Sequence, residues 1–167
     1  MVLIKPPAGS VGPPSKGCIL SGKGLKTLKD VEFPPGITTL DVSHNELTSL
    51  EGCPSTITHL YAYRNQLPNF VGVPAGLKFI DAHGNPITSS KGLEACLALK
   101  TVVMYMSELS EVSGFPDSVE HLNVAANRIG KIVSLPKSIR EFLYAMNRLP
   151  DEFVDKTVDE LRVLLRQ

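Results

Sequence analysis

Apolar and polar positions along the chain follow one short frame that occurs seven times. The frame has apolar residues at its first, third and eighth positions, and in five copies an asparagine at its sixth. Copies begin at Cys18, Leu40, Leu60, Ile80, Val102, Leu122 and Phe142. Successive copies therefore start 22, 20, 20, 22, 20 and 20 residues apart. A fixed period of this length is typical of a solenoid, in which each repeat forms one coil.

The start of each frame predicts a short strand. Its two leading apolar residues, such as Leu40 and Val42, alternate with outward residues, which is the period of a β-strand. Another apolar residue lies three positions before each of the six leads from Leu40 onward, at Ile37, Ile57, Leu77, Leu99, Val119 and Ile139. We therefore expect one parallel strand per coil, with these apolar side chains stacked in the interior.

The full frame, L-x-x-L-x-L-x-x-N-x-L, resembles the leucine-rich repeat over residues 18 to about 153. That resemblance implies that the asparagine side chains form an interior ladder bonded to the backbone of adjacent coils: Asn45, Asn65, Asn85, Asn127 and Asn147. A buried amide is costly unless it is paired in this way. Ser107 could do part of this bonding, whereas Lys23 could not, so the first copy is interpreted as a cap.

Two repeat subtypes are mixed along the chain, and they differ on the convex side. The 20-residue repeats carry an apolar-proline pair before each strand: Phe33-Pro34, Cys53-Pro54, Val73-Pro74, Phe115-Pro116 and Leu135-Pro136. Proline favours an extended segment without a helix, and these repeats resemble those of bacterial type III effectors, some of which carry ubiquitin-ligase domains. The segment 89–99 lacks the proline and spaces Leu93, Cys96 and Leu97 like a helical turn. It resembles the 22-residue repeats of eukaryotic phosphatase regulators and dynein light chains.

These observations predict an α/β solenoid, a right-handed superhelix with one curved parallel sheet on its concave face and a mostly extended convex side. We expect a flexible lead at 1–16, about seven coils over 17–153, and a C-terminal capping helix at 154–167. The sequence Thr157-x-x-Glu160 matches a capping box. It precedes apolar residues on roughly one helical face: Val158, Leu161, Leu164 and Leu165. The alternative for this helix is that it docks a partner.

Composition narrows the functional classes. The chain has 17 basic and 17 acidic residues, so no strong field favours nucleic acid or an anionic membrane. No apolar run of 18 residues exists, which argues against a membrane span. The three cysteines fall in different repeats and the cysteine-clustered caps of extracellular repeats are absent. Free thiols in a reducing, cytoplasmic compartment are the better interpretation.

The outward positions of the concave sheet hold the candidate binding residues. We expect a partner to contact Asp41, His59, Tyr61, Tyr63, Arg64, Phe79, Asp81, His83, Val103, Tyr105, Met106 and His121. Aromatic residues with few lysines are typical of interface cores, and Tyr and Arg are common among residues that dominate binding energy. The alternative is that aromatic side chains simply suit an exposed strand surface.

The same residues do not predict catalysis or metal binding. His59 and His121 lie three strands apart, about 14 Å at the usual strand spacing, so their side chains cannot converge on one ion. No cysteine lies on the concave face, and Gly22-Lys23-Gly24 lacks the spacing of a phosphate-binding loop. We therefore expect no catalytic residue, no metal and no cofactor.

The predicted function is a non-catalytic protein–protein interaction module, an adaptor or scaffold. It would be monomeric alone and would bind a protein or peptide partner, not nucleic acid or a membrane, through the concave sheet. The alternative is the substrate-recognition part of a larger enzyme or of a secreted effector delivered into a host cell, for example of the ubiquitin-ligase type. A weaker possibility is a structural repeat that oligomerises through its edge or through Val163, Leu164 and Leu165.

Overall fold

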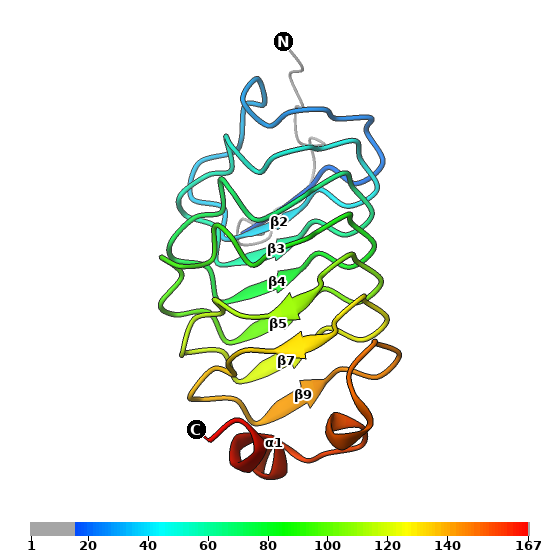
Figure 1. Cartoon of the computed structure of the whole chain (residues 1–167). Helices are drawn as coiled ribbons and strands as arrows, with labels where there is room; N and C mark the ends of the chain where they lie inside the picture. Colours follow the sequence, from blue (N-terminus) through cyan, green and yellow to red (C-terminus); the bar gives the residue numbers. More distant parts are fainter. Residues whose placement is uncertain (1–15, 167) are drawn as a thin grey trace.

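The computed structural model describes residues 16–166, which form a stack of coils with one strand in each (Figure 1). Almost all of the predicted flexible lead, 1–16, lies outside the described residues. Seven parallel strands make one sheet: β1 (Gly17–Ile19), β2 (Thr39–Asp41), β3 (His59–Tyr61), β4 (Phe79–Asp81), β5 (Thr101–Val103), β7 (His121–Asn123) and β9 (Glu141–Leu143). A second parallel pair joins β6 (Glu111–Val112) to β8 (Lys131–Ile132). The predicted solenoid fold is confirmed.

The strands share one register along the whole sheet. The middle residue of each strand pairs with the middle residue of the next, in the order Cys18, Leu40, Leu60, Ile80, Val102, Leu122 and Phe142. These are the lead positions of the seven sequence frames. Because side chains alternate between the two faces of a strand, equivalent positions of successive repeats form continuous rows inside and outside the solenoid.

The interior rows form a single apolar core. The leads from Leu40 to Phe142 are buried, as are all six apolar residues predicted three positions before them. Cys18, which leads the first copy, is only half-buried. Phe70 is the largest fully buried side chain of the described residues. Burial of such a side chain stabilises the fold by about 1.5–3 kcal/mol.

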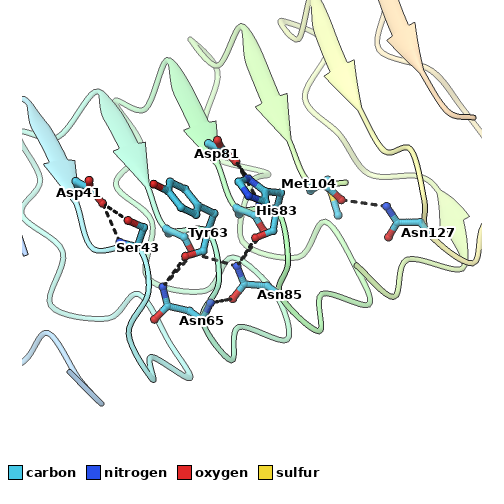
Figure 2. A network of polar contacts seen from close by, with 11 residues as sticks. Asp41, Ser43, Tyr63, Asn65, Asp81, His83, Asn85, Met104 and Asn127 are labelled. Carbon is cyan, nitrogen blue, oxygen red and sulfur yellow. Dashed lines mark hydrogen bonds and ion pairs between the residues drawn. The ribbon is translucent and has the colours of Figure 1, made fainter. Parts of the chain in front are cut away.

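The asparagine side chains tie each coil to the one before it (Figure 2). Asn65 Nδ2 donates to Val42 O in the preceding coil at 3.0 Å and to Ala62 O in its own coil at 3.1 Å. Its Oδ1 accepts the N–H of Leu47 at 2.9 Å. Asn85 repeats this pattern one coil later, and its Oδ1 also accepts the N–H of Asn65. The bonding that the leucine-rich repeat resemblance implied is therefore confirmed.

The first coil donates hydrogen bonds to the asparagine ladder but has no ladder asparagine of its own. Lys23 occupies the asparagine position, but its side chain is exposed. The backbone N–H groups of Lys23 and Leu25 instead donate to Asn45 Oδ1, at 2.9 and 3.0 Å.

The ladder has a gap at Ser107. Among the described residues, its Oγ is the one buried side-chain polar atom without a hydrogen-bond partner. The expectation that Ser107 replaces part of the asparagine bonding is wrong, because a hydroxyl on a single carbon is too short to reach the neighbouring coil's backbone. The N–H of Ile87 is equivalent to that of Leu67, which donates to Asn85 Oδ1 at 3.0 Å. At Ile87 no such side-chain acceptor is present within the described chain.

The longer repeat at 89–99 forms successive turns and not a helical turn. The N–H of Leu93 donates to Ser90 O, and the N–H of Cys96 donates to Leu93 O. Leu93 and Cys96 are fully buried, but Leu97 is 78% exposed and does not share a face with them, as a helical turn would require. Gly92 has φ +104°, and a Cβ there would overlap the backbone of Phe70 in the previous coil. This close approach of turns leaves no room for a helix on the convex side.

The C-terminal end of the core is covered by a short helix. A 3-10 turn at Asp151–Phe153 leads to α1 (Val158–Leu164), which lies beside β9 at the end of the solenoid (Figure 1). The capping box is confirmed, since Thr157 Oγ1 accepts the N–H of Glu160 and the Glu160 carboxylate accepts the N–H of Thr157. Leu161 is fully buried, whereas Leu164 is 42% exposed.

We predict that Ser107→Asn stabilises the chain by about 1–2 kcal/mol, because the new amide pairs the N–H of Ile87 and removes an unsatisfied buried hydroxyl. Urea unfolding followed by circular dichroism measures this change. The matched control, Asn85→Ser, creates a second gap and should destabilise the chain by about 2 kcal/mol. A Ser107→Asn variant that is less stable than the parent contradicts the ladder gap.

Candidate binding surface on the concave sheet

The even register arranges the outward residues in parallel rows. The first row runs Thr39, His59, Phe79, Thr101, His121 and Glu141. The second row runs Asp41, Tyr61, Asp81, Val103, Asn123 and Leu143. A third row, just beyond the strands, contains Tyr63, His83 and Tyr105. The structure thus brings the predicted concave residues of these rows onto one face.

Rings of the third row stack on one another across three coils. The His83 ring lies between Tyr63, with centroids 4.6 Å apart, and Tyr105, with centroids 4.4 Å apart. Both pairs are within 8° of parallel. His44 contacts the other side of Tyr63 edge-on at 5.3 Å. We call His44, Tyr63, His83 and Tyr105 the aromatic stack; each ring pair contributes about 0.5–1.5 kcal/mol beyond its buried area.

A second group of rings lies beside the stack. Phe79 packs nearly parallel to His59 at a centroid distance of 6.0 Å, and it contacts Tyr61 at 5.3 Å with a tilt of 49°. Because the rings cover one another, Tyr61 and Phe79 are half-buried, as is Val103. Their remaining surface faces the concave side as a preformed apolar floor.

The carboxylates of two aspartates hydrogen-bond to neighbouring polar groups on this face. Asp81 Oδ1 lies 2.7 Å from His83 Nδ1 and accepts the backbone N–H of His83 (Figure 2). An ionised Asp81 makes Nδ1 the donor, which leaves Nε2 of the neutral ring as an acceptor. Asp41 Oδ1 accepts the N–H and the hydroxyl of Ser43, whose buried Oγ also lies 2.9 Å from Ser21 Oγ. Both aspartates are therefore held in one orientation.

The residue before each ladder position has a left-handed backbone conformation. The φ values lie between 51° and 67° at Gly22, His44, Arg64, Gly84, Met106, Ala126 and Met146. This conformation ends the extended segment that follows each strand. Arg64 and Met106 are accordingly exposed at the edge of the face, and Met106 is 63% exposed.

The remaining predicted histidines are placed apart from the stack. His59 Nδ1 lies 3.0 Å from Thr58 Oγ1, and His121 Nδ1 lies 3.1 Å from Glu141 Oε2. Over residues 16–166, no group of three or more His, Cys, Asp or Glu side chains could hold a metal ion.

The three cysteines are free and poorly suited to nucleophilic chemistry. Burial raises the pKa of the Cys53 thiol from 9.0 to about 12. Burial also raises the pKa of Cys18, and burial together with the charge of Glu94 raises that of Cys96. The thiolate is the reactive species, so these groups are kept in their inert, protonated form.

Sequence reasoning missed a cavity at the C-terminal end of the sheet. It has a volume of about 530 Å³ and lies between the last coil and the segment that precedes α1. The available signal was the apolar character of Leu143 and Met146 at outward positions of the final repeat. Both are exposed, by 46% and 82%.

Solved structures similar to this chain are leucine-rich repeat proteins. A Shigella effector leucine-rich repeat domain matches with a TM-score of 0.68 and 22% identity, over 91% of this chain and 75% of that one. The effector YopM from Yersinia pestis matches with a TM-score of 0.62 and 17% identity, over 80% of this chain and half of YopM. An internalin from Listeria monocytogenes matches with a TM-score of 0.55 and 13% identity, over 70% of this chain and 43% of that one.

These likenesses show the leucine-rich repeat fold. No family profile and no curated protein matches the sequence. Among the described residues, no helix has the length and apolar character that crossing a membrane requires.

We predict that Cys53 and Cys96 react with iodoacetamide at about pH 8 at least a hundredfold more slowly in the folded chain than in urea, because burial suppresses the thiolate. Mass spectrometry of the alkylated peptides measures both rates. A raised folded-state pKa also means that the thiols favour the folded state below their unfolded pKa and that this contribution is lost as pH rises above about 9. Rapid labelling of Cys53 in the folded chain contradicts its placement.

Proposed function

We propose that this chain is a non-catalytic interaction module of the cytoplasm, an adaptor or scaffold that binds a protein or peptide through its concave sheet. The aromatic stack is the observation that carries the proposal. It places adjoining rings, flanked by oriented carboxylates, at outward positions of the sheet.

The stack supports binding because it is already ordered. A side chain that is immobilised only on association costs about 0.5–1.5 kcal/mol of conformational entropy. Tyr63 and Tyr105 are held against His83 before a partner arrives, and Asp81 holds His83 in turn. Tyrosine is also over-represented among the residues that dominate interface energies. A partner that presents an apolar or aromatic side chain beside a hydrogen-bond donor fits this face.

A second candidate is the recognition part of a longer effector. It is favoured by the likeness to the Shigella effector domain, three quarters of which this chain spans, and to the Yersinia effector YopM. In this case the concave sheet would select the substrate or host target, and another part of the protein would act on it. Both candidates assign binding to the same surface.

Replacement of two rings of the stack tests the proposal. We predict that Tyr63→Ser/Tyr105→Ser loses a partner that the parent chain retains from a lysate of the native host. With the purified partner, affinity should fall by about 30-fold or more, because central aromatic residues of interfaces contribute about 2 kcal/mol or more. Both side chains are half-buried on the outer face, so the core remains intact. Isothermal titration calorimetry measures the two affinities.

The matched control is Leu97→Ser/Val163→Ser, which removes two exposed apolar side chains from the convex side and from α1. It should bind like the parent. If this control loses the partner while the tyrosine variant retains it, the interface lies off the concave face and the proposal is wrong. Circular dichroism and thermal unfolding of all variants establish that each remains folded.

A further inference from the structure

The sheet ends at β9, whose outer edge has the same backbone geometry as the strands that are followed by another coil. In the coil before it, the N–H groups of Val124 and Ala126 each donate to the next coil, to Leu143 O and Ala145 O, both at 2.8 Å. The same pair of bonds recurs between the earlier coils. Each coil thus offers two regularly spaced backbone donors to the coil that follows.

In the last coil the equivalent donors are the N–H groups of Tyr144 and Met146. Within residues 16–166 neither has a hydrogen-bond acceptor. Unpaired N–H groups on a strand edge form a template for an added strand. Figure 1 shows β9 as the last strand of the row, with the chain passing below it toward α1.

A cavity lies next to this edge. Its lining combines the last coil with the segment before α1: Phe142, Leu143, Tyr144, Ala145, Met146, Asn147, Leu149, Val154, Asp155, Lys156 and Thr157. Leu143, Met146 and Val154 are each more than 40% exposed, so its mouth is apolar.

The Tyr144 side chain fixes the far wall of the cavity. Its hydroxyl accepts the N–H of Lys156 at 2.8 Å, and it lies 2.8 Å from both Phe153 O and Lys156 O, one of which accepts its proton. The segment before α1 is therefore bound to a side chain of the last coil and not to the backbone donors of the edge. This leaves the edge free while the far wall is held in place.

We propose that the β9 edge and this cavity bind an extended segment of a partner protein, which joins the sheet as an additional parallel strand. Carbonyl oxygens of the segment, which are partially negative, would accept hydrogen bonds from the partially positive N–H groups of Tyr144 and Met146. One of its apolar side chains would enter the cavity. Strand addition of this kind combines main-chain bonds, which give affinity, with a side-chain pocket, which gives specificity.

The occupant is a single strand and not a complete coil of a second copy of this chain. Leu161 of α1 is already fully buried against the end of the core. Arg162 Nη2 bonds α1 to Lys137 O and Ile139 O of the last coil, at 3.0 and 3.3 Å. The interior half of a further coil is thus occupied, and the strand position remains open. This site is separate from the aromatic stack and does not depend on the function proposed above.

The chain itself supplies a probe with the required edge. At the end of β7 and just after it, Asn123 O and Ala125 O accept the N–H groups of Met104 and Met106, at 2.9 and 3.1 Å. A synthetic peptide with the sequence of residues 119–127 therefore presents the acceptors that the β9 edge needs. With the full chain, we expect this peptide to slow hydrogen exchange of the Tyr144 and Met146 amides by about tenfold or more, since a new bond protects each.

Two methylated peptides provide the matched control. The N–H of His121 faces the preceding strand, where it donates to Lys100 O, whereas the N–H of Val124 faces the following strand. N-methylation at His121 should therefore weaken binding by about tenfold, and N-methylation at Val124 should leave it unchanged. Equal binding of the two methylated peptides, or no protection at millimolar peptide, overturns the proposal.

Protein variants separate this site from the concave face. Val154→Asp places a charge in the cavity and should weaken peptide binding by about tenfold, whereas Val163→Asp, on the exposed side of α1, should not. Tyr63→Ser/Tyr105→Ser should bind the peptide like the parent, so the failure of one proposal is distinguishable from the failure of the other. If the free chain forms dimers at rising concentration and protects the Met146 amide, a second copy is the occupant and the proposal is wrong.

Discussion

The interior hydrogen bonds of the asparagine side chains are the constraint on which the rest of the structure depends. A ladder asparagine accepts a backbone N–H of the preceding coil with its side-chain oxygen. Its side-chain NH2 group donates to one carbonyl of the preceding coil and one of its own coil, as Asn65 does with Leu47, Val42 and Ala62. A buried amide tolerates few other arrangements, because an unpaired polar group in an apolar core costs about 1–3 kcal/mol. Successive coils are therefore held in one register, and a shift of one residue between coils would break the hydrogen bonds of every ladder asparagine.

The arrangement of the candidate binding surface follows from that register. Strands in a sheet lie about 4.8 Å apart, and the rings of Tyr63, His83 and Tyr105 are 4.6 and 4.4 Å apart. Rings at equivalent positions of adjacent coils consequently stack face to face without distortion of the backbone. The outward side chains can change without disturbing the ladder. Recognition on such a scaffold is set by a few grafted side chains.

Most of the fold could be predicted because the constraint is periodic. Residues at the repeat positions of Leu40 and Asn65 have equivalent neighbours in every coil. A periodic pattern in the sequence therefore corresponds directly to rows of side chains in the structure. The structure differs from the sequence prediction where side-chain length or local backbone geometry determines the contacts. Ser107 has the right polarity but not the reach of an asparagine, and Leu97 follows a turn where the spacing indicated a helix. The sequence placed His83 on the concave face, but its stacking between two tyrosines depends on side-chain rotamers that spacing does not specify. The cavity beside β9 depends on the path of residues 154–157, which no longer follow the repeat.

Native-state hydrogen exchange at the ladder tests the account most directly. The backbone N–H groups of Leu47, Leu67, Leu109 and Ile129 each donate to an asparagine Oδ1. The equivalent N–H of Ile87 has no such acceptor among the described residues, because Ser107 occupies the asparagine position and its Oγ makes no hydrogen bond. If the side-chain amides hold the coils together, the first four amides exchange slowly, near the rate of global unfolding, and Ile87 exchanges distinctly faster. Equal protection at Ile87 and Leu67 would contradict the account, since the coils would then be held by packing alone.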